Sequence, residues 1–292
     1  MKGDIKRLPD MRYTHQVGGM EMKIAIIGFG YVGQAIDRFF KEKYETVVYD
    51  PAKTQLCDNR DDIQTCDLAV VCVPTPMKSD GSCNTSIVEE VVGWLETPLI
   101  MVKSTVPPGT CSRIAGETGK RIVFSPEYIG ESSYYTPPEW MNPTECIEHP
   151  YHIFGGEQHD TSAIIDIYLP IVGPAVRFIQ MERNAAEMVK YMENAFGALK
   201  VTWCNEMYGL CEKLDLDWHT VREGWLADNR VSRCHTAVFA DSRGYGGKCF
   251  PKDVAALVQF ADGYAKLMEA VQSRNDMLRA DQLPTEKNTC SK

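Results

Sequence analysis

The feature that most constrains this 292-residue chain is a glycine pattern, Gly28-x-Gly30-x-x-Gly33, directly after the apolar run MKIAIIG. A strand followed by this pattern and then a helix is typical of dinucleotide-binding α/β domains. The first glycine permits a tight turn, the second lets the backbone approach a pyrophosphate, and the third lets helix and strand pack closely. The helix N-terminus, with its free N–H groups, favours the anion. The pattern therefore predicts a dinucleotide site.

Asp50 ends the next apolar run, where its carboxylate can accept hydrogen bonds from the adenosine ribose hydroxyls. A carboxylate there would repel a 2′-phosphate, so we expect NAD rather than NADP as the cofactor, although Lys53 lies nearby. The cofactor residues expected from this part of the chain are Gly28, Gly30, Tyr31, Val32, Gly33, Asp50 and Lys53.

Short apolar runs alternate with helical stretches over the first part of the chain: MKIAIIG, ETVVYD, DLAVVCVP, PLIMVKS, KRIVFSP and YHIFGG. Runs of this kind predict a parallel sheet covered on both faces, that is, a doubly wound, Rossmann-like α/β domain. From Asn184 to Leu214, apolar residues recur at helical spacing without proline, which predicts one long central helix. Further helices are expected over 218–227 and 252–278. The predicted organisation is a disordered leader (1–21), a dinucleotide-binding domain (22–182), a mainly helical central domain (183–279) and a tail (280–292).

Composition excludes several classes of function. The net charge of −9 argues against a general nucleic-acid binder. No apolar run approaches the ~20 residues that span a bilayer, and the N-terminus lacks a signal-peptide core, so we expect no membrane contact and a cytoplasmic location. The eleven cysteines include no C-x-x-C pair, which predicts reduced thiols and no metal site.

The segment GYGGKCFPKD, residues 244–253, predicts a second functional site. Glycines before Cys249 let the backbone approach a ligand, and the N-terminus of a following helix can lower a thiol pKa. Lys248 and Lys252 would favour the thiolate, and Asp253 could hydrogen-bond a reacting hydroxyl or water. Lys190 and Asn194, at i and i+4, share one face of the central helix.

Seven motifs in order, GFGYVG, VCVPTPMKSDGS, STVPPGT, SPEYIGES, KYMENAFGALKVTWCNE, DNR and GYGGKCFPKD, resemble the UDP-glucose/GDP-mannose dehydrogenase family from about residue 22 to 278. The resemblance implies a Rossmann-like domain, a long helix that forms a homodimer, and NAD-dependent oxidation of C6 of a nucleotide sugar, most readily UDP-glucose, to the carboxylate in two hydride transfers. The nucleophile implied is Cys249, through a thiohemiacetal and a thioester.

The resemblance also implies a role for each matched residue. Lys190 and Asn194 would stabilise the oxyanion, and Asp253 would help to deprotonate the alcohol. Glu127 would take part in proton transfer and thioester hydrolysis, and Glu131 would lie near the nicotinamide. At the cofactor the resemblance implies Val73, Thr75 and Thr105, of which Thr105 is also catalytic. At the substrate it implies Tyr128, Arg230, Tyr245 and Gly246, together with Glu127, Lys190 and Asn194. Arg230 would reach the substrate of the other subunit in a dimer.

The chain also departs from the family pattern. The segment 132–150 is long and rich in aromatic residues and proline, His152 stands where arginine is usual, and the chain ends soon after the helix that follows Cys249, as if the C-terminal nucleotide-binding domain were absent. Two alternatives follow: a non-catalytic or partner-dependent NAD-binding scaffold, and a two-domain 3-hydroxyacid dehydrogenase. The second performs one hydride transfer and has no need of GGKCFPKD.

Overall fold

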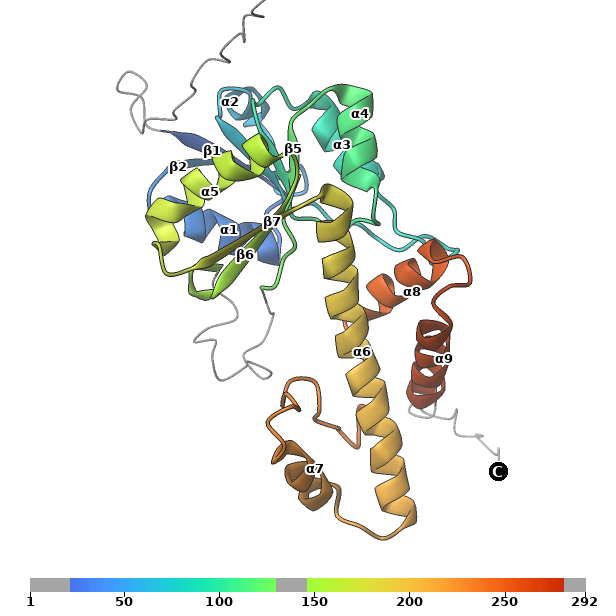
Figure 1. Cartoon of the computed structure of the whole chain (residues 1–292). Coiled ribbons are helices and arrows are strands. Elements are labelled where there is room, and N and C mark those ends of the chain that lie inside the picture. Colours follow the sequence, from blue (N-terminus) through green and yellow to red (C-terminus); the bar gives the residue numbers. More distant parts are fainter. Residues whose placement is uncertain (1–21, 130–145, 281–292) are drawn as a thin grey trace, which may run out of the picture.

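The computed structural model describes residues 22–129 and 146–280. Within these ranges the six predicted apolar runs all form strands of one sheet. With a seventh strand, the order is β2-β1-β3-β4-β5-β6-β7 (Figure 1). The strands are β1 (Lys23–Ile27), β2 (Glu45–Tyr49), β3 (Leu68–Val71), β4 (Ile100–Val102), β5 (Ile122–Phe124), β6 (Tyr151–Gly155) and β7 (Arg177–Met181).

The sheet is parallel as predicted from β2 to β5, and β6 also pairs parallel with β7. The pairing of β5 with β6, through Phe124 and Gly155, is antiparallel, so the sheet is mixed. Strand β7 was not expected from the sequence. It lies at the sheet edge and its residues are only half-buried or exposed, so it lacks the continuous apolar run of a central strand.

Helices cover both faces of the sheet, as a doubly wound fold requires. On one face, α1 (Tyr31–Lys41) and α5 (Gln158–Val172) pack Phe39, Phe40 and Tyr168 against the strands, together with the short 3-10 helix η2 (Cys146–Glu148). On the other, α2 (Arg60–Ile63), α3 (Ser86–Trp94) and α4 (Thr110–Thr118) contribute buried aliphatic side chains.

The long helix predicted for the central region is α6 (Arg183–Lys213), 31 residues that extend away from the sheet (Figure 1). Helices α8 (Phe250–Phe260) and α9 (Lys266–Ala280) pack along it, and α7 (Trp218–Leu226) lies near its far end. The expected helical stretch 252–278 is thus two helices. The chain turns between them at Asp262 and Gly263, which both have positive φ angles.

The parallel strands β1 to β5 all end at the same edge of the sheet, and in such sheets ligands bind at this edge. The segments that follow these strands carry Gly28–Gly33, Asp50, Thr75, Thr105 and Glu127. Helix α6 begins beside the same sheet, since Ala186 belongs to its core. No helix in the described ranges is long and apolar enough to cross a membrane.

Candidate active site

The glycine turn after β1 has the geometry of a phosphate-binding loop. Gly28 has a φ of +87°, and a Cβ there would lie 2.8 Å from the Cys72 carbonyl oxygen. A Cβ on Gly33 would lie 2.0 Å from the carbonyl oxygen of Gly28, so α1 packs directly on the turn. At Gly30, by contrast, no described atom lies within 4 Å of a Cβ position. Protein packing therefore explains two of the glycines and leaves the space above Gly30 for a ligand, which fits the pyrophosphate of NAD.

Asp50 and Lys53 hold the turn from the side of β2. One Asp50 oxygen accepts the Phe29 N–H at 2.8 Å, and the other accepts the Ala52 N–H at 3.0 Å. Lys53 donates to the Phe29 carbonyl at 2.5 Å, with its ammonium 4.9 Å from the Phe29 ring centre. Both side chains therefore border the phosphate loop. Tyr31 is exposed at the start of α1, whereas Val32 packs into the core beneath it.

A second group of predicted residues meets where α6 and α8 face each other. Lys190 Nζ lies 3.3 Å from the Asn194 side-chain oxygen, and Asn194 donates to Asp253 at 2.5 Å. All three side chains are buried. The i, i+4 spacing on α6 and the first turn of α8 thus bring an ammonium, an amide and a carboxylate into one hydrogen-bonded row.

Lys252 connects this row to the cofactor edge of the sheet. It forms an ion pair with Asp253 and donates to the Thr75 hydroxyl at 3.4 Å. Thr75 in turn donates to the Thr105 carbonyl oxygen at 2.8 Å. Lys252 therefore has a defined partner in Asp253, which sequence reasoning had not assigned. Val73, just before this group, is buried in the sheet core.

Cys249 is the residue that precedes the first turn of α8, and its carbonyl accepts the Asp253 N–H at 2.9 Å. Its side chain is exposed, and the ten cysteines of the described ranges are all thiols. The N-terminus of a helix stabilises a thiolate by its free N–H groups and its dipole. Cys249 and Asp253 thus lie one helical turn apart, with the cysteine exposed and the aspartate buried.

Glu127 is a buried side chain that follows β5. One of its oxygens accepts the N–H groups of Tyr128 and Ile129, both at 2.8 Å, and the other lies 3.1 Å from Lys103 Nζ. Burial raises the pKa of this carboxyl, but the Lys103 ammonium and the backbone donors outweigh it and lower the pKa below its usual value. The Tyr128 ring lies 5.3 Å from Lys190 Nζ, which connects Glu127 to the row on α6.

Other predicted residues lie apart from this network. Arg230 is 89% exposed and pairs with Asp228. Tyr245 is buried beside α9, where its backbone pairs with Asn275, and Gly246 lies close to Arg279. Their contacts within one chain are structural. Glu131 lies outside the described residues.

Two buried residues that support the site were missed by sequence reasoning, Lys103 and Glu187. Glu187 accepts the N–H groups of Gly109 and Cys111, at 2.6 and 2.8 Å, and so ties the start of α4 to α6. Glu187 lies three residues before Lys190 on the same helical face, which is the signal that could have found it. Lys103 is a charged residue at the end of a buried apolar run, and this position could have identified it as a residue of the site.

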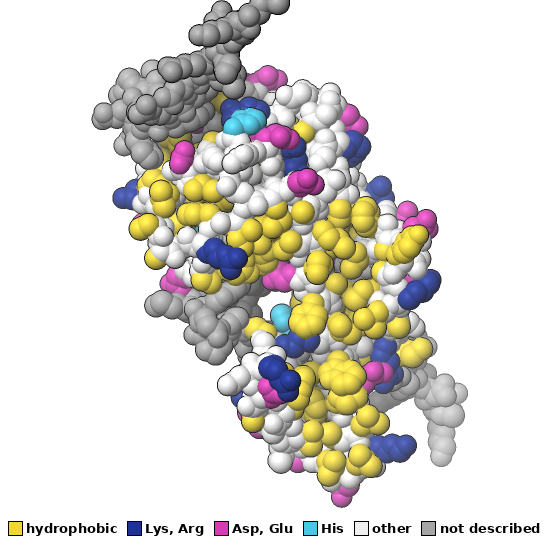
Figure 2. Space-filling model, in the orientation of Figure 1, with side chains coloured by type: hydrophobic (Ala, Val, Ile, Leu, Met, Phe, Trp, Pro, Cys, Tyr) yellow, Lys and Arg dark blue, Asp and Glu magenta, His cyan; other side chains and the backbone are white. Residues whose placement is uncertain are grey.

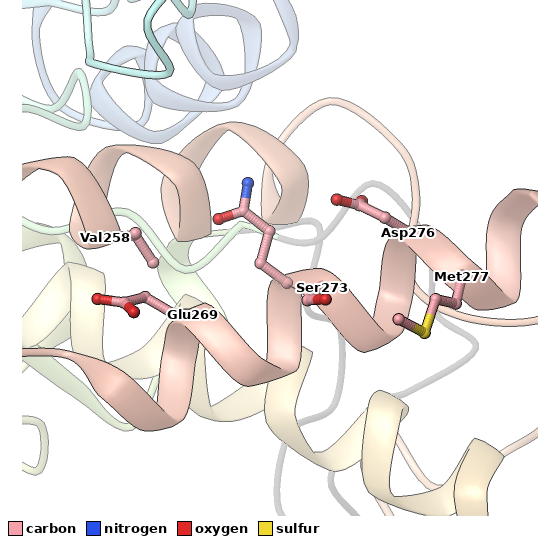
Figure 3. Close-up of a pocket in the computed structure, with 6 residues that line it drawn as sticks. Val258, Glu269, Ser273, Asp276 and Met277 are labelled. Carbon is pink, nitrogen blue, oxygen red and sulfur yellow. The ribbon is translucent and has the colours of Figure 1, made fainter.

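A groove of about 400 Å³ lies between α8 and α9, lined by Val258, Glu269, Gln272, Ser273, Asp276 and Met277 (Figure 3). None of the candidate residues lines it. It is therefore separate from the site at the sheet edge.

The fold and the site together define a class. A doubly wound sheet with a glycine loop after its first strand is the architecture of proteins that bind a dinucleotide at the carboxyl ends of the strands. Two models of one family match the chain: the NAD binding domain of the UDP-glucose/GDP-mannose dehydrogenase family over residues 52–171, and its central domain over residues 184–277. The chain belongs to this family, and NAD is the cofactor of its nucleotide-binding domain.

Individual relatives agree with the family models. The chain is 30% identical to the putative UDP-glucose 6-dehydrogenase YtcA of Bacillus subtilis, over 87% of this chain and 68% of the relative. It is 29% identical to UDP-glucose 6-dehydrogenase of Pseudomonas aeruginosa, over 87% of this chain and 65% of the relative. The structure of a UDP-glucose dehydrogenase from Pyrobaculum islandicum superposes with a TM-score of 0.70 at 25% identity, over 90% of this chain and 69% of that one. The chain spans between about half and two thirds of the length of several curated relatives that it matches.

Proposed function

We propose that this protein oxidises the C6 primary alcohol of a nucleotide sugar, UDP-glucose, to the carboxylate, with NAD as the hydride acceptor. The observation that carries the proposal is the hydrogen-bonded row from Lys190 through Asn194, Asp253 and Lys252 to Thr75 at the cofactor edge. It supports a reacting carbon held between Cys249 and the nicotinamide. The names of the relatives support the choice of UDP-glucose.

In the first step the alcohol loses its hydroxyl proton and a hydride and becomes an aldehyde. Asp253 would accept the proton through a water, and the Lys190 ammonium, with Asn194, would stabilise the alkoxide as charge develops. These groups are buried and hydrogen-bonded before substrate arrives, so little reorganisation is needed.

In the second step the Cys249 thiolate adds to the aldehyde carbon and forms a thiohemiacetal, which can lose a second hydride and become a thioester. Water then forms a new C–O bond, the C–S bond breaks and the thiolate is regenerated. The balance is one alcohol, two NAD⁺ and one water giving one carboxylate, two NADH and three protons. Glu127, with its lowered pKa, would accept the proton of the attacking water.

The test is NADH production by the purified protein with NAD and a panel of UDP- and GDP-sugars. Two NADH per UDP-glucose, with turnover abolished in Cys249→Ser, would support the four-electron reaction. Cys234→Ser, which changes another cysteine in the helical region, serves as the control and should retain turnover.

The same experiment separates the alternatives. With 3-hydroxy acids added to the panel, one NADH per hydroxy acid, unaffected by Cys249→Ser, would favour a 3-hydroxyacid type of reaction. Binding of NAD without NADH from any sugar nucleotide would favour a scaffold or a partner-dependent enzyme.

We further propose a homodimer through α6. One face of this helix exposes Met188, Met192, Phe196, Trp203 and Leu210. Figure 2 shows hydrophobic side chains gathered in a continuous band over this part of the molecule. Exposed apolar patches of this extent are typical of protein interfaces. The exposed Arg230 is free of the buried network and so suits contact with substrate in a second copy.

The dimer is tested by light scattering of the protein as it elutes from a size-exclusion column. Phe196→Asp should convert a dimer to a monomer, because a carboxylate would be buried at the centre of the band. Tyr264→Asp, at an almost fully exposed aromatic on the turn between α8 and α9, is the matched control and should stay dimeric. A monomeric wild-type protein with full activity would refute both the dimer and the role of Arg230.

A further inference from the structure

Two charged side chains are buried side by side where β4 and β5 end. The side chains of Lys103 and Glu127 are only 2% and 7% exposed, and Nζ lies 3.1 Å from Oε2. Lys103 also donates to the Ser125 hydroxyl at 3.2 Å. Because both side chains follow neighbouring parallel strands, the fold fixes their separation. A buried pair of this kind is costly to form, and removal of one partner leaves an uncompensated buried charge.

The partners of the Glu127 carboxylate indicate which form it takes. Two backbone N–H groups and the Lys103 ammonium, all of them donors, contact the carboxylate. A protonated carboxyl must donate a hydrogen bond, and none of these three groups can accept one. These donors therefore favour the carboxylate, and the two backbone N–H groups fix the orientation of one of its oxygens.

Other titratable groups face the pair from each neighbouring element. His149 adds a favourable interaction with Glu127, whereas Glu193 on α6 opposes its charge. Burial and Lys103 lower the pKa of His152 on β6 to about 3, so that imidazole is neutral. Cys72 after β3, Cys146 on η2 and Tyr168 on α5 also lie near the pair, and burial raises the pKa of Cys72 and Tyr168. Lys103 is the cation in direct contact with the carboxylate.

We propose that Lys103 is a positioning residue that keeps Glu127 charged and oriented as the base for thioester hydrolysis. This inference rests on the proposed function. In the step concerned, water attacks the thioester carbon, the C–S bond to Cys249 breaks, and the proton of the water passes to Glu127. Lys103 acts only through Glu127, since its ammonium is turned into the protein interior between Glu127 and Ser125.

The first test compares Lys103→Met with Lys103→Arg, which keeps the positive charge. Without a counterion, burial should raise the pKa of the Glu127 carboxyl to near neutrality. The readout is the sugar adduct on Cys249, followed by intact mass after mixing with NAD and UDP-glucose at pH 6 and pH 8. Lys103→Met should accumulate the adduct at pH 6 and release it roughly tenfold faster at pH 8.

Wild type and Lys103→Arg should release the adduct with less than about a twofold difference between the two pH values, because their base is already ionised at pH 6. A purely structural role for Lys103 would slow both hydride transfers and hydrolysis alike, at both pH values. If Lys103→Met releases the adduct at pH 6 at the same rate as wild type, the proposal is overturned.

Thermal unfolding provides a second test that does not require activity. Each single variant, Lys103→Met and Glu127→Gln, should unfold at a lower temperature than wild type, because each leaves one buried charge uncompensated. The double variant should unfold at a higher temperature than either. Additive losses in the double variant would overturn the ion pair.

The experiments distinguish failure of the proposed function from failure of the present inference. If wild type makes no NADH from any sugar nucleotide, the proposed function fails and the hydrolytic role of Lys103 fails with it, while the unfolding temperatures still decide whether the pair exists. If wild type turns over but Lys103→Met keeps the wild-type pH dependence, only the present inference is overturned.

Discussion

The three glycines of the nucleotide loop should respond differently to one added methyl group. Gly33→Ala places a Cβ 2.0 Å from the Gly28 carbonyl oxygen, whereas Gly30→Ala meets no described atom within 4 Å. Gly30 has φ −75° and ψ −159°, an extended conformation that alanine adopts without strain. The first variant therefore tests packing of the protein, and the second tests approach of the cofactor.

The magnitudes follow from these distances. A carbon and a carbonyl oxygen rarely approach closer than about 3.3 Å, so α1 must move by more than about 1 Å in Gly33→Ala. Overpacking of this degree should cost about 3 kcal/mol of stability. In Gly30→Ala the free energy of unfolding should change by less than about 1 kcal/mol. The methyl group would instead displace the pyrophosphate from the N–H groups of α1, and the loss of one such charge-assisted bond, about 1.5–3 kcal/mol, weakens NAD binding roughly 10- to 100-fold.

The assays are denaturant unfolding without cofactor and calorimetric titration with NAD. Gly116→Ala, at an exposed glycine of α4 with no described atom near its Cβ position, is the control and should leave NAD affinity unchanged. Wild-type NAD affinity in Gly30→Ala would refute the placement of the pyrophosphate over this residue. Wild-type stability in Gly33→Ala would refute the close packing of α1 on the turn.

Two further predictions concern buried ionisable groups. Because burial lowers the pKa of His152 to about 3 from 6.5, the unfolded chain binds more protons between these values, and stability should fall by about 2 kcal/mol from pH 7 to pH 5. The His152→Phe side chain suits the neighbouring rings of Phe154 and Phe178, and unfolding experiments at both pH values should find that its loss of stability lacks this contribution of about 2 kcal/mol. An unchanged pH dependence would contradict the assignment of the loss to His152. Glu187→Ala should cost about 3 kcal/mol of stability, because it leaves one buried and one partly buried N–H group at the start of α4 unpaired. An unfolding free energy within about 0.5 kcal/mol of wild type would count against this tie between α4 and α6.

Much of this architecture could be predicted from the sequence, because its signals are local. The runs that became β1 to β6 are short and apolar, as strands buried on both faces must be, and the glycine turn needs only the residues between 28 and 33. The periodicity of α6 lies within one continuous segment, so Lys190 and Asn194 were placed on a common face correctly. The edge strand β7 was missed because a half-exposed strand carries no such signal.

The sequence by itself determined the class of fold and the glycine turn after the first strand, and it predicted the residues that we propose for the chemistry. Only the tertiary structure decided which of these residues meet: Lys103 with Glu127, Glu187 with the start of α4, and Lys252 with both Asp253 and Thr75. Lys252 and Thr75 are 177 residues apart in the chain. Local propensity and periodicity reach only a few residues along the chain, whereas these contacts depend on how strands end at one edge and how α8 packs on α6.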